Sequence, residues 1–422
     1  MTNRNRASCK IVSSRKATAG LSVYTSCDVS CEKMVYKAKR NRCLNVFISL
    51  IVAMSLVFLS GCGSPVLLQQ DINQAAGGTT HTVQDCENRS VELPLKLEHI
   101  ACCDSFAGEL CVMSGAGPQI IGCPSGVRSD KLLQEIYPGL QDNTIHLSGG
   151  HLNAETLLEY NCDLAIVRPN LSESEYSKLD KLGIPYLIVG YSNMDEQMGA
   201  MRVVGQALGG KPQEKIDKLI DYYQDVISLV GNRTSQVDEK SRVQVYHSIN
   251  DALLSDGYQS LGKDWIEKAG AQDLSAQKDL GPSKDYIVSA EQIYSWNPQV
   301  IINNSAQATE EFKTFKNWEG LAAVENNHIY TVPTGLSRWG QRGSTETYLA
   351  CLWLGTTLYP DLFADIDFKQ EVVDYYKLFF DIDVDDTLYA SMMSGVGLRQ
   401  IGSQNNNSGP VKDGTSSTGA HQ

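Results

Sequence analysis

The sequence lacks the short motifs that mark several large classes of enzyme. Its 422 residues contain no GxSxG, no P-loop and no cysteine quartet with cluster-binding spacing. Those motifs supply the nucleophile of α/β-hydrolases, the phosphate cradle of P-loop NTPases and the ligands of iron–sulfur clusters. We therefore expect that the protein is not an enzyme and needs no cofactor of its own.

Histidine is scarce and scattered. A protein site for Zn²⁺ or Mn²⁺ needs three or four converging His, Asp or Glu side chains. The sequence has seven histidines and no HxH pair. They are at positions 81, 99, 146, 151, 247, 328 and 421. We therefore expect no site for a bare metal ion.

Positive charge is scarce after the first 61 residues. The whole chain has a formal charge of −13. Ten Lys or Arg and two Asp or Glu precede Cys62, so residues 62–422 hold 26 basic and 47 acidic residues, a charge of −21. Nucleic-acid binding depends on the neutralisation of phosphates, so this balance argues against a nucleic-acid partner. It suits an exported domain beside a membrane.

Cysteine pairs with CxxC spacing are absent among the seven cysteines that follow Cys62. These are at positions 86, 102, 103, 111, 123, 162 and 351, mostly within apolar runs such as HIACCD and ELCVM. Disulfides are one interpretation in an oxidising compartment. We expect buried free thiols that pack as small hydrophobic groups.

The N-terminal region is typical of an export signal. Residues 44–59 are uncharged, and basic residues precede them at 37, 39, 40 and 42. The run is short for a spanning helix, which needs about 20 apolar residues. It ends in LSGC (59–62), which resembles the bacterial lipobox, so we expect cleavage before Cys62 and a diacylglycerol on its thiol. A plain transmembrane anchor is the alternative.

Residues 1–61 thus form the signal peptide, preceded by an extension. Met34 begins an ordinary signal sequence, so residues 1–33 are either a mis-assigned start or an extra N-terminal tail. Residues 62–79 read as a polar linker behind a lipid anchor on the outer face of the cell membrane. Residues 401–422 have the composition of a disordered tail.

The part between linker and tail alternates strand and helix patterns. Expected strands include 99–103, 118–122, 163–167, 184–190, 242–249 and 328–333; expected helices include 106–117, 172–182, 195–208, 261–270, 310–323, 344–358 and 368–380. Such alternation predicts an α/β fold with mostly parallel sheets. We expect two Rossmann-like lobes, 80–209 and 233–400, with separate cores and a ligand cleft between them. Residues 210–232 carry one apolar stripe over several turns, which predicts a single long helix joining the lobes.

One phrase occurs in both lobes. Residues 153–166 read NAETLLEYNCDLAI, and residues 289–302 read SAEQIYSWNPQVII. Each predicts a short helix followed by a strand, with Glu155 and Glu291 at matching positions near the helix start. An acidic residue there interacts favourably with the helix dipole, which is a sufficient structural reason for both.

These segments resemble the substrate-binding lipoproteins of ABC importers. The lipobox, HLNAETLLEYNCDLAIV, DYIVSAEQIYSWNPQVIIN and WEGLAAVENNHIYTVP occur here in the order seen in the class with a rigid helix between lobes, which serves ferric-siderophore, haem and cobalamin uptake. The resemblance covers roughly residues 80–400. It implies a monomer whose Glu155 and Glu291 dock into arginine pockets of a permease dimer with its ATPase subunits.

Candidate ligand-binding residues lie where strands end. Arginine binds carboxylates and catecholates, and aromatic rings cover flat ligands. The candidates are Ser105, Phe106, Arg128, His151, Arg168, His247, Tyr258, Arg338, Trp339 and Arg342. Arg338 with Trp339 is the favoured pair, and His151 and His247 are candidates to flank the metal of a haem or corrinoid.

The sequence therefore predicts a lipid-anchored protein that binds a ferric siderophore and delivers it to an ABC permease. Haem or a corrinoid is the alternative ligand. A ligand-sensing lipoprotein, a structural surface lipoprotein and an enzyme on the same fold are alternatives of other classes.

Overall fold

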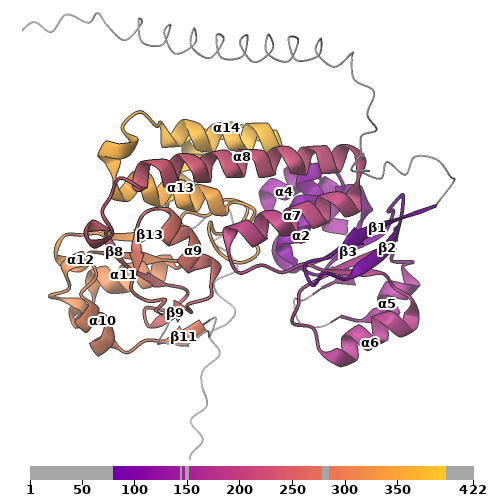
Figure 1. Cartoon of the computed structure of the whole chain (residues 1–422), viewed down its shortest axis with the longest axis horizontal. Coiled ribbons are helices and arrows are strands. Elements are labelled where there is room, and N and C mark those ends of the chain that lie inside the picture. The colour runs from indigo at the N-terminus through magenta and orange to yellow at the C-terminus, as the bar shows by residue number, and fades with distance from the viewer. Residues whose placement is uncertain (1–78, 143–144, 148–151, 278–284, 396–422) are drawn as a thin grey trace, which may run out of the picture. The chain divides into compact units, whose positions relative to one another are not determined.

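The computed structural model describes residues 79–142, 145–147, 152–277 and 285–395 (Figure 1). The lipidation candidate Cys62, the signal peptide, the ligand candidate His151 and the predicted tail lie outside these ranges. Within them, no helix combines the length and the apolar character needed to cross a membrane.

The N-terminal part of the fold is a five-stranded parallel sheet that follows a hairpin. The hairpin pairs β1 (Thr80–Gln84) with β2 (Ser90–Pro94). The sheet has the order β5-β4-β3-β6-β7, with every neighbouring pair parallel. Its strands are β3 (Ile100–Cys102), β4 (Ile120–Cys123), β5 (Ile145–His146), β6 (Leu164–Val167) and β7 (Tyr186–Ile188).

The C-terminal part holds a four-stranded parallel sheet with the order β10-β8-β12-β13. Its strands are β8 (Gln244–Ser248), β10 (Gln272–Asp273), β12 (Val300–Asn303) and β13 (Ile329–Thr331). A separate antiparallel pair joins β9 (Leu254–Asp256) to β11 (Asp285–Ile287). The predicted α/β class with two mostly parallel sheets is confirmed.

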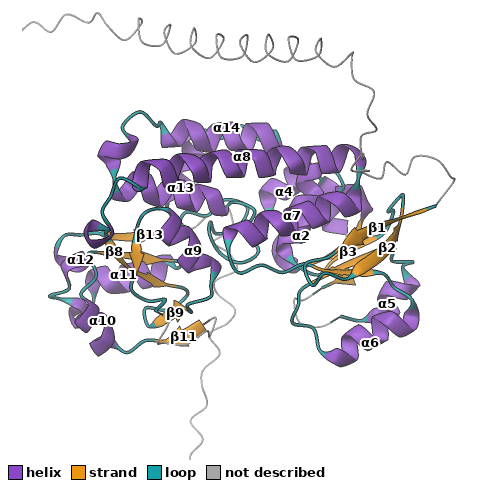
Figure 2. Cartoon of the chain, in the orientation of Figure 1, coloured by secondary structure: helices purple, strands orange, loops and turns teal. Residues whose placement is uncertain are grey.

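Helices flank the strands of both sheets (Figure 2). Those of the N-terminal part are α2 (Ser105–Ser114), α3 (Ser125–Arg128), α4 (Lys131–Ile136), α5 (Ala154–Glu159), α6 (Glu173–Leu182) and α7 (Met194–Leu208). Those of the C-terminal part are α9 (Leu261–Lys268), α10 (Ala290–Trp296), α11 (Ala306–Thr314), α12 (Ala322–Glu325), α13 (Thr347–Leu358), α14 (Phe368–Phe380) and α15 (Asp386–Met393). Short 3₁₀ turns fill several connections: Gly117–Gln119, Pro138–Asp142, Glu239–Ser241, Lys316–Trp318 and Pro360–Phe363.

The long helix predicted at 210–232 is α8 (Gly210–Thr234). Its predicted apolar stripe is buried at Ile216, Leu219, Ile220, Tyr223, Val226 and Val230. It packs against α2 and α7 of the N-terminal part and against α9 and α13 of the C-terminal part. Figure 1 shows α8 running alongside α13 and α14 at the top of the view. The bridging helix is therefore integrated into the packing of both parts.

The hydrophobic core differs from the expectation of two separate cores. Successive residues of each central strand point to opposite faces of the sheet. In β6, Leu164 joins a cluster that contains residues of α2, α8, α13 and α14, whereas Ala165 joins a smaller cluster under α5 and α6. In β12, Ile302 belongs to that same large cluster and Ile301 to a third cluster under α10 and α11. One core therefore runs continuously from sheet to sheet.

The repeated phrase forms the same unit twice. Asn153 caps α5 and Ser289 caps α10, each by accepting a hydrogen bond from a backbone N–H of the first turn. Asn161 and Asn297 end the two helices with positive φ angles of 52° and 45°. The following strands, β6 and β12, are both internal strands of their sheets.

Several segments differ from the prediction. Residues 310–323, predicted as one helix, are split between the end of α11, a 3₁₀ turn and the start of α12. The helices α3 and α4, and the C-terminal helix α15, were not predicted from the sequence. Each of these helices has eight residues or fewer, too short for a clear apolar period.

Tyr223 provides a test of the shared core. Its ring is fully buried on α8, lies 5.2 Å from the ring of Tyr348, and its hydroxyl donates to Gln197 Oε1. We expect Tyr223→Ala to lower the free energy of unfolding by about 3–5 kcal/mol because it leaves a large cavity. Tyr223→Phe removes only the hydroxyl and should cost about 1 kcal/mol.

Urea denaturation followed by circular dichroism measures both changes. Leu378→Ala, on the exposed side of α14, is the control and should change stability little because this side chain is 60% exposed. A Tyr223→Ala variant as stable as the Leu378→Ala variant would contradict the packing described.

Candidate ligand-binding cleft

Two adjoining pockets lie at the carboxyl ends of the strands, where open α/β sheets bind ligands. The larger, of about 1040 Å³ and open to solvent, is lined by Arg168, Ile249, Asn250, Asp256, Ser260, Leu261, Gly262, Asn304, Gly340, Gln341 and Arg342. The smaller, of about 340 Å³, is lined by Asp104, Arg168, Pro169, Asn170, Val189, Gly190, Tyr191 and Arg342. Arg168 and Arg342 line both, so the two pockets form one cleft.

Arg168 comes from the N-terminal sheet and directly follows β6. Its Nε donates to the carboxylate of Asp104, the residue that caps α2 by accepting from the backbone N–H of Phe106. Burial opposes the charge of Arg168, yet the Asp104 carboxylate holds its pKa above the ordinary value. The Arg168 side chain is still 27% exposed, so part of its guanidinium remains open to the cleft although Asp104 compensates its charge.

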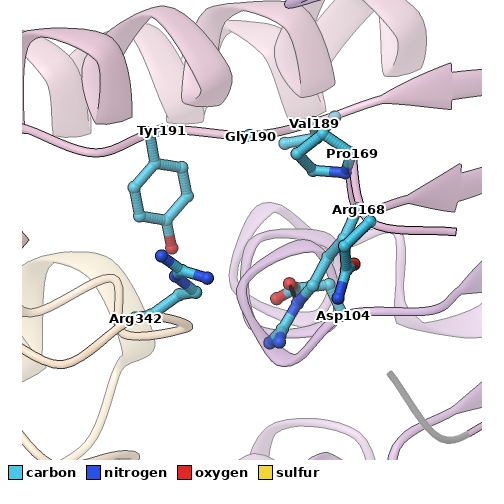
Figure 3. Close-up of a pocket in the computed structure, with 8 residues that line it drawn as sticks. Asp104, Arg168, Pro169, Val189, Gly190, Tyr191 and Arg342 are labelled. Carbon is cyan, nitrogen blue, oxygen red and sulfur yellow. Dashed lines mark hydrogen bonds and ion pairs between the residues drawn. The ribbon is translucent and has the colours of Figure 1, made fainter. Parts of the chain in front are cut away.

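Arg342 enters from the opposite side, on the loop before α13. Figure 3 shows its guanidinium beneath the ring of Tyr191 and across the pocket from Arg168 and Asp104. A β-carbon built on the next residue, Gly343, would lie 3.8 Å from Arg168 Nη2. Arg168 and Arg342 are 174 positions apart in the chain, and the fold brings both of them to the cleft.

The Arg342 loop is held by three side chains of the N-terminal part. Tyr191 accepts a hydrogen bond from the backbone N–H of residue 343 at 3.0 Å, and Gln197 donates to the carbonyl of residue 344 at 2.8 Å. Glu109 accepts from both the backbone N–H and the hydroxyl of Thr345, at 3.1 and 3.0 Å. We call residues 343–345 with these three partners the loop clamp. It fixes Arg342 relative to the N-terminal sheet.

A second buried glutamate lies beside the clamp. The Glu346 carboxylate accepts hydrogen bonds from the backbone N–H groups of Leu336 and Ser337 and from the hydroxyl of Tyr376. Burial raises the pKa of the Glu346 carboxyl to about 7, against these three donors. Burial, together with the nearby Glu346, also raises the pKa of Glu109 well above its usual range.

Two predicted ligand residues, Trp339 and Phe106, lie behind the cleft and do not line it. Trp339, in the favoured pair, is fully buried and packs edge-on against Phe368, with ring centroids 6.0 Å apart. Phe106 is buried against Tyr191, with centroids 4.8 Å apart. Both rings therefore build the wall behind the cleft, which corrects the expectation of direct aromatic contact.

Arg338 and Tyr258 lie outside the residues that line the two pockets. Arg338 is half-buried and contacts Gln341 Oε1 at 3.2 Å and Asn250 Oδ1 at 3.5 Å, so it supports two residues that do line the cleft. Tyr258 is partly exposed, with Lys263 Nζ 5.1 Å from its ring centroid.

The other candidates divide similarly. Ser105 is half-buried at the start of α2, and its Cβ would lie 3.6 Å from a β-carbon built on Gly343. Arg128 is half-buried at the end of α3 and does not line either pocket. His247 lies beneath the cleft, where it contacts Asp256 and Asn304. We expected His247 to flank the metal of a haem or corrinoid, but the ring is buried and both of its nitrogens face Asp256 or Asn304 and not the pocket.

Sequence reasoning missed Tyr191, Asp256 and Asn304 as lining residues. All three follow or end a strand, which is the signal that identified Arg168, but Tyr191 and Asn304 come from strands whose ends carried no charged residue. Asp256 ends β9, a strand that the sequence did not predict.

The cysteines of the described residues are free thiols, as the sequence predicts. All seven cysteines after Cys62 are free there, and six are buried. Burial raises the pKa of Cys162 to about 11 and that of Cys351 to about 12, so these thiols are unreactive. Over the described part of the chain, no group of three His, Cys, Asp or Glu side chains could hold a metal ion.

Sequence comparison assigns the family. The profile of the periplasmic binding protein family matches residues 100–335, more than half of the chain. The chain belongs to the periplasmic binding protein family. This confirms the resemblance to the substrate-binding proteins of ABC importers, and the two-sheet fold with a cleft is the architecture of this family.

Several periplasmic binding proteins are similar to this chain in sequence or in fold. The molybdate-binding protein MolA of Haemophilus influenzae is 23% identical over 323 residues, which cover 71% of this chain and 90% of MolA. The structure of MolA bound to molybdate has a TM-score of 0.64 at 20% identity, covering 72% of this chain and 99% of that one.

Two further structures share the fold. Helicobacter pylori CeuE with Ni(II) bound has a TM-score of 0.61 at 21% identity, covering 74% of this chain and 99% of CeuE. The haem-binding protein RhuT of Roseiflexus sp. RS-1 has a TM-score of 0.50 at 18% identity, covering 63% of this chain and 99% of RhuT. At these identities the likeness concerns the fold, and the ligands of these proteins differ: molybdate for MolA, Ni(II) for CeuE and haem for RhuT.

Glu346 leads to a prediction about pH. Its folded pKa of about 7 lies above the ordinary 4.5, so the folded state binds more protons than the unfolded state between these values. Stability therefore falls as pH rises from 4.5 to 7, by about 3 kcal/mol from this group. We expect Glu346→Gln to flatten this part of the stability profile.

Urea midpoints measured at half-unit steps between pH 4.5 and 8 test this expectation. Glu310→Gln, exposed on α11, should keep the wild-type slope. A Glu346→Gln variant with the wild-type slope would show that another group causes the pH dependence.

Proposed function

We propose that this periplasmic binding protein captures an anionic ferric siderophore in the cleft and delivers it to an ABC permease. The observation that carries the proposal is the meeting of Arg168 and Arg342 in one cleft. Arginine forks bind carboxylate and catecholate oxygens with two parallel hydrogen bonds. The larger pocket is open to solvent and leaves room for a ligand bigger than a simple oxyanion.

A molybdate-type oxyanion is the second candidate ligand. The relative MolA binds molybdate, and the same two arginines suit a compact tetrahedral dianion. The large open pocket argues for the chelate, because an oxyanion would fill a small part of it.

Haem and corrinoids are less well supported. Among the described residues that line the two pockets, Tyr191 is the aromatic one, while Trp339 and Phe106 are buried behind the wall. A flat macrocycle gains much of its affinity from aromatic faces, which this wall does not present.

The remaining parts of the proposal concern location and partners. We infer a monomer on the outer face of the cell membrane, tethered by a lipid on Cys62, that works with a permease dimer and its ATPase subunits. Neither nucleic acid nor a cofactor of its own belongs to this function, and no covalent chemistry is required. A sensor lipoprotein would use the same cleft without needing Glu155 and Glu291.

Both docking candidates are available for such a permease. Glu155 and Glu291 lie in the first turns of α5 and α10 and are exposed. In Figure 1 these two helices lie on the same side of the molecule, opposite α8. Hydrogen bonds from its own backbone N–H and from the Ser289 hydroxyl lower the pKa of Glu291, so its charge is retained. Two similar acidic helices suit a partner made of two similar subunits.

Substitution of Arg342 tests the ligand site. We expect Arg342→Ala to weaken binding of a ferric tris-catecholate, or of molybdate, about 10- to 100-fold, because a charged hydrogen bond contributes about 1.5–3 kcal/mol. Isothermal titration calorimetry with these two probes, haemin and cyanocobalamin measures the change and ranks the ligands.

Arg202→Ala, an exposed arginine on α7, is the matched control and should bind like the wild type. Equal affinity of the Arg342→Ala and wild-type proteins would remove the arginine site. Binding of haemin alone would replace the anionic-chelate ligand by haem.

Charge reversal tests the docking surface. We expect Glu155→Arg combined with Glu291→Arg to abolish uptake while the affinity for ligand stays unchanged, because both residues lie away from the cleft. Uptake of radiolabelled iron or molybdate by cells measures the first effect, and calorimetry measures the second.

The matched control reverses two exposed glutamates elsewhere, Glu173→Arg on α6 with Glu310→Arg on α11. This pair should retain uptake. Normal uptake by the Glu155/Glu291 double variant would rule out docking through these residues.

A further inference from the structure

The floor of the cleft contains a buried histidine that the arginine site does not explain. His247 lies on β8 and is 1% exposed. Its Nδ1 lies 3.1 Å from Asp256 Oδ2, as a close ion pair rather than an aligned hydrogen bond. Its Nε2 lies 3.1 Å from Asn304 Oδ1. Asp256 and Asn304 both line the larger pocket, so His247 is separated from ligand by one layer of side chains.

Both ring nitrogens face oxygen atoms that accept hydrogen bonds. A neutral imidazole carries one N–H and can satisfy one of them, whereas an imidazolium carries two. A second carboxylate, Asp273 of β10, also faces the ring, and the edge of Trp265 from α9 covers it at 5.9 Å between centroids. The surroundings therefore favour the charged form of His247.

The pair is held in place by the first turn of α9. A β-carbon built on Gly262 would lie 2.0 Å from Asp256 Oδ2 and 3.2 Å from His247 Cε1. A larger residue at position 262 would therefore push Asp256 out of its present position, so glycine here permits the contact between Asp256 and His247. The Asp256 side chain is nevertheless 19% exposed, on the side of the pocket.

We propose that proton uptake by His247 sets the net charge of the cleft floor and thereby tunes the affinity for an anionic ligand. The inference rests on the proposed function in that it takes the ligand to be an anion bound by Arg168 and Arg342. With His247 protonated, its charge compensates Asp256. With His247 neutral, Asp256 presents an uncompensated negative charge to the ligand.

The direction of the pH dependence follows from the pKa of His247. Burial would lower it, but the carboxylates of Asp256 and Asp273 and the contact with Asn304 raise it above the ordinary 6.5. Affinity for an anion is therefore highest below this raised pKa and falls as pH rises through it. Loss of one positive charge from the cleft floor should change the dissociation constant of an anion bound beside it about tenfold.

Calorimetry between pH 5.5 and 8.5, with molybdate and a ferric tris-catecholate as probes, tests the inference. We expect wild-type affinity to fall about tenfold over this range. His247→Gln should bind with the weak, high-pH affinity throughout, because Asp256 stays uncompensated. Asp256→Asn should keep the tight, low-pH affinity even at pH 8.5. Damage to the fold would weaken both variants, so opposite effects distinguish charge from structure.

The contrary outcomes are separable from failure of the proposed function. The inference is overturned if His247→Gln and Asp256→Asn both show the pH dependence of the wild type, or if both bind more weakly at every pH. The arginine site is tested separately by Arg342→Ala. Absence of binding by either probe overturns the proposed function. Independently of either probe, ¹⁵N NMR of the histidine side chains tests the charge on which the inference depends. The expected result is a mostly doubly protonated His247 at pH 6.5 that becomes neutral in Asp256→Asn, and a neutral ring in the wild type overturns the inference.

Discussion

The loop clamp is the contact on which the rest of the site depends. Three successive residues after Arg342 are bound by side chains from the loop after β7, from α7 and from α2. All of these partners are buried or half-buried, so water does not compete well for the hydrogen bonds. Arg168, which follows β6, and Arg342, on the loop before α13, are therefore held at a fixed separation, as a rigid ligand bound by both would require.

The loop clamp and α8 both restrict motion of one sheet relative to the other. A helix that packs on both parts limits large hinge motions, because a packed core has discrete rather than continuous arrangements. This packing leaves little freedom for the two sheets to move apart, and the loop before α13 contacts both parts of the fold.

Much of the fold could be predicted because its signals are local. The alternating strands and helices, the apolar stripe of α8 and the repeated phrase around Glu155 and Glu291 each depend on residues close together in the chain. Arg168 and Arg342 were identified because they follow strand ends or lie in a loop rich in arginine. The helix predicted at 310–323 failed because Phe315 has an extended backbone there, although its neighbours favour a helix.

The burial of aromatic and ionisable side chains could not be read in the same way. Trp339 occurs in a polar loop and Phe106 at the start of a helix that follows a strand, and both are covered through long-range packing, by α14 and by Tyr191. His247 follows the same rule, since its partner Asp256 belongs to a strand that only the three-dimensional structure reveals. Sequence patterns locate such residues near the site but do not determine which atoms face the ligand.

The continuous core has a further consequence for how the halves relate to each other. Because α13 and α14 complete the packing around α2 and α8, the largest hydrophobic cluster is shared by both halves and closed by neither alone. A gene fragment that ends after α8 would expose apolar surface that the C-terminal helices normally cover. Exchange of one half with that of a relative would therefore require matched substitutions along this boundary, so the two halves are constrained to evolve together.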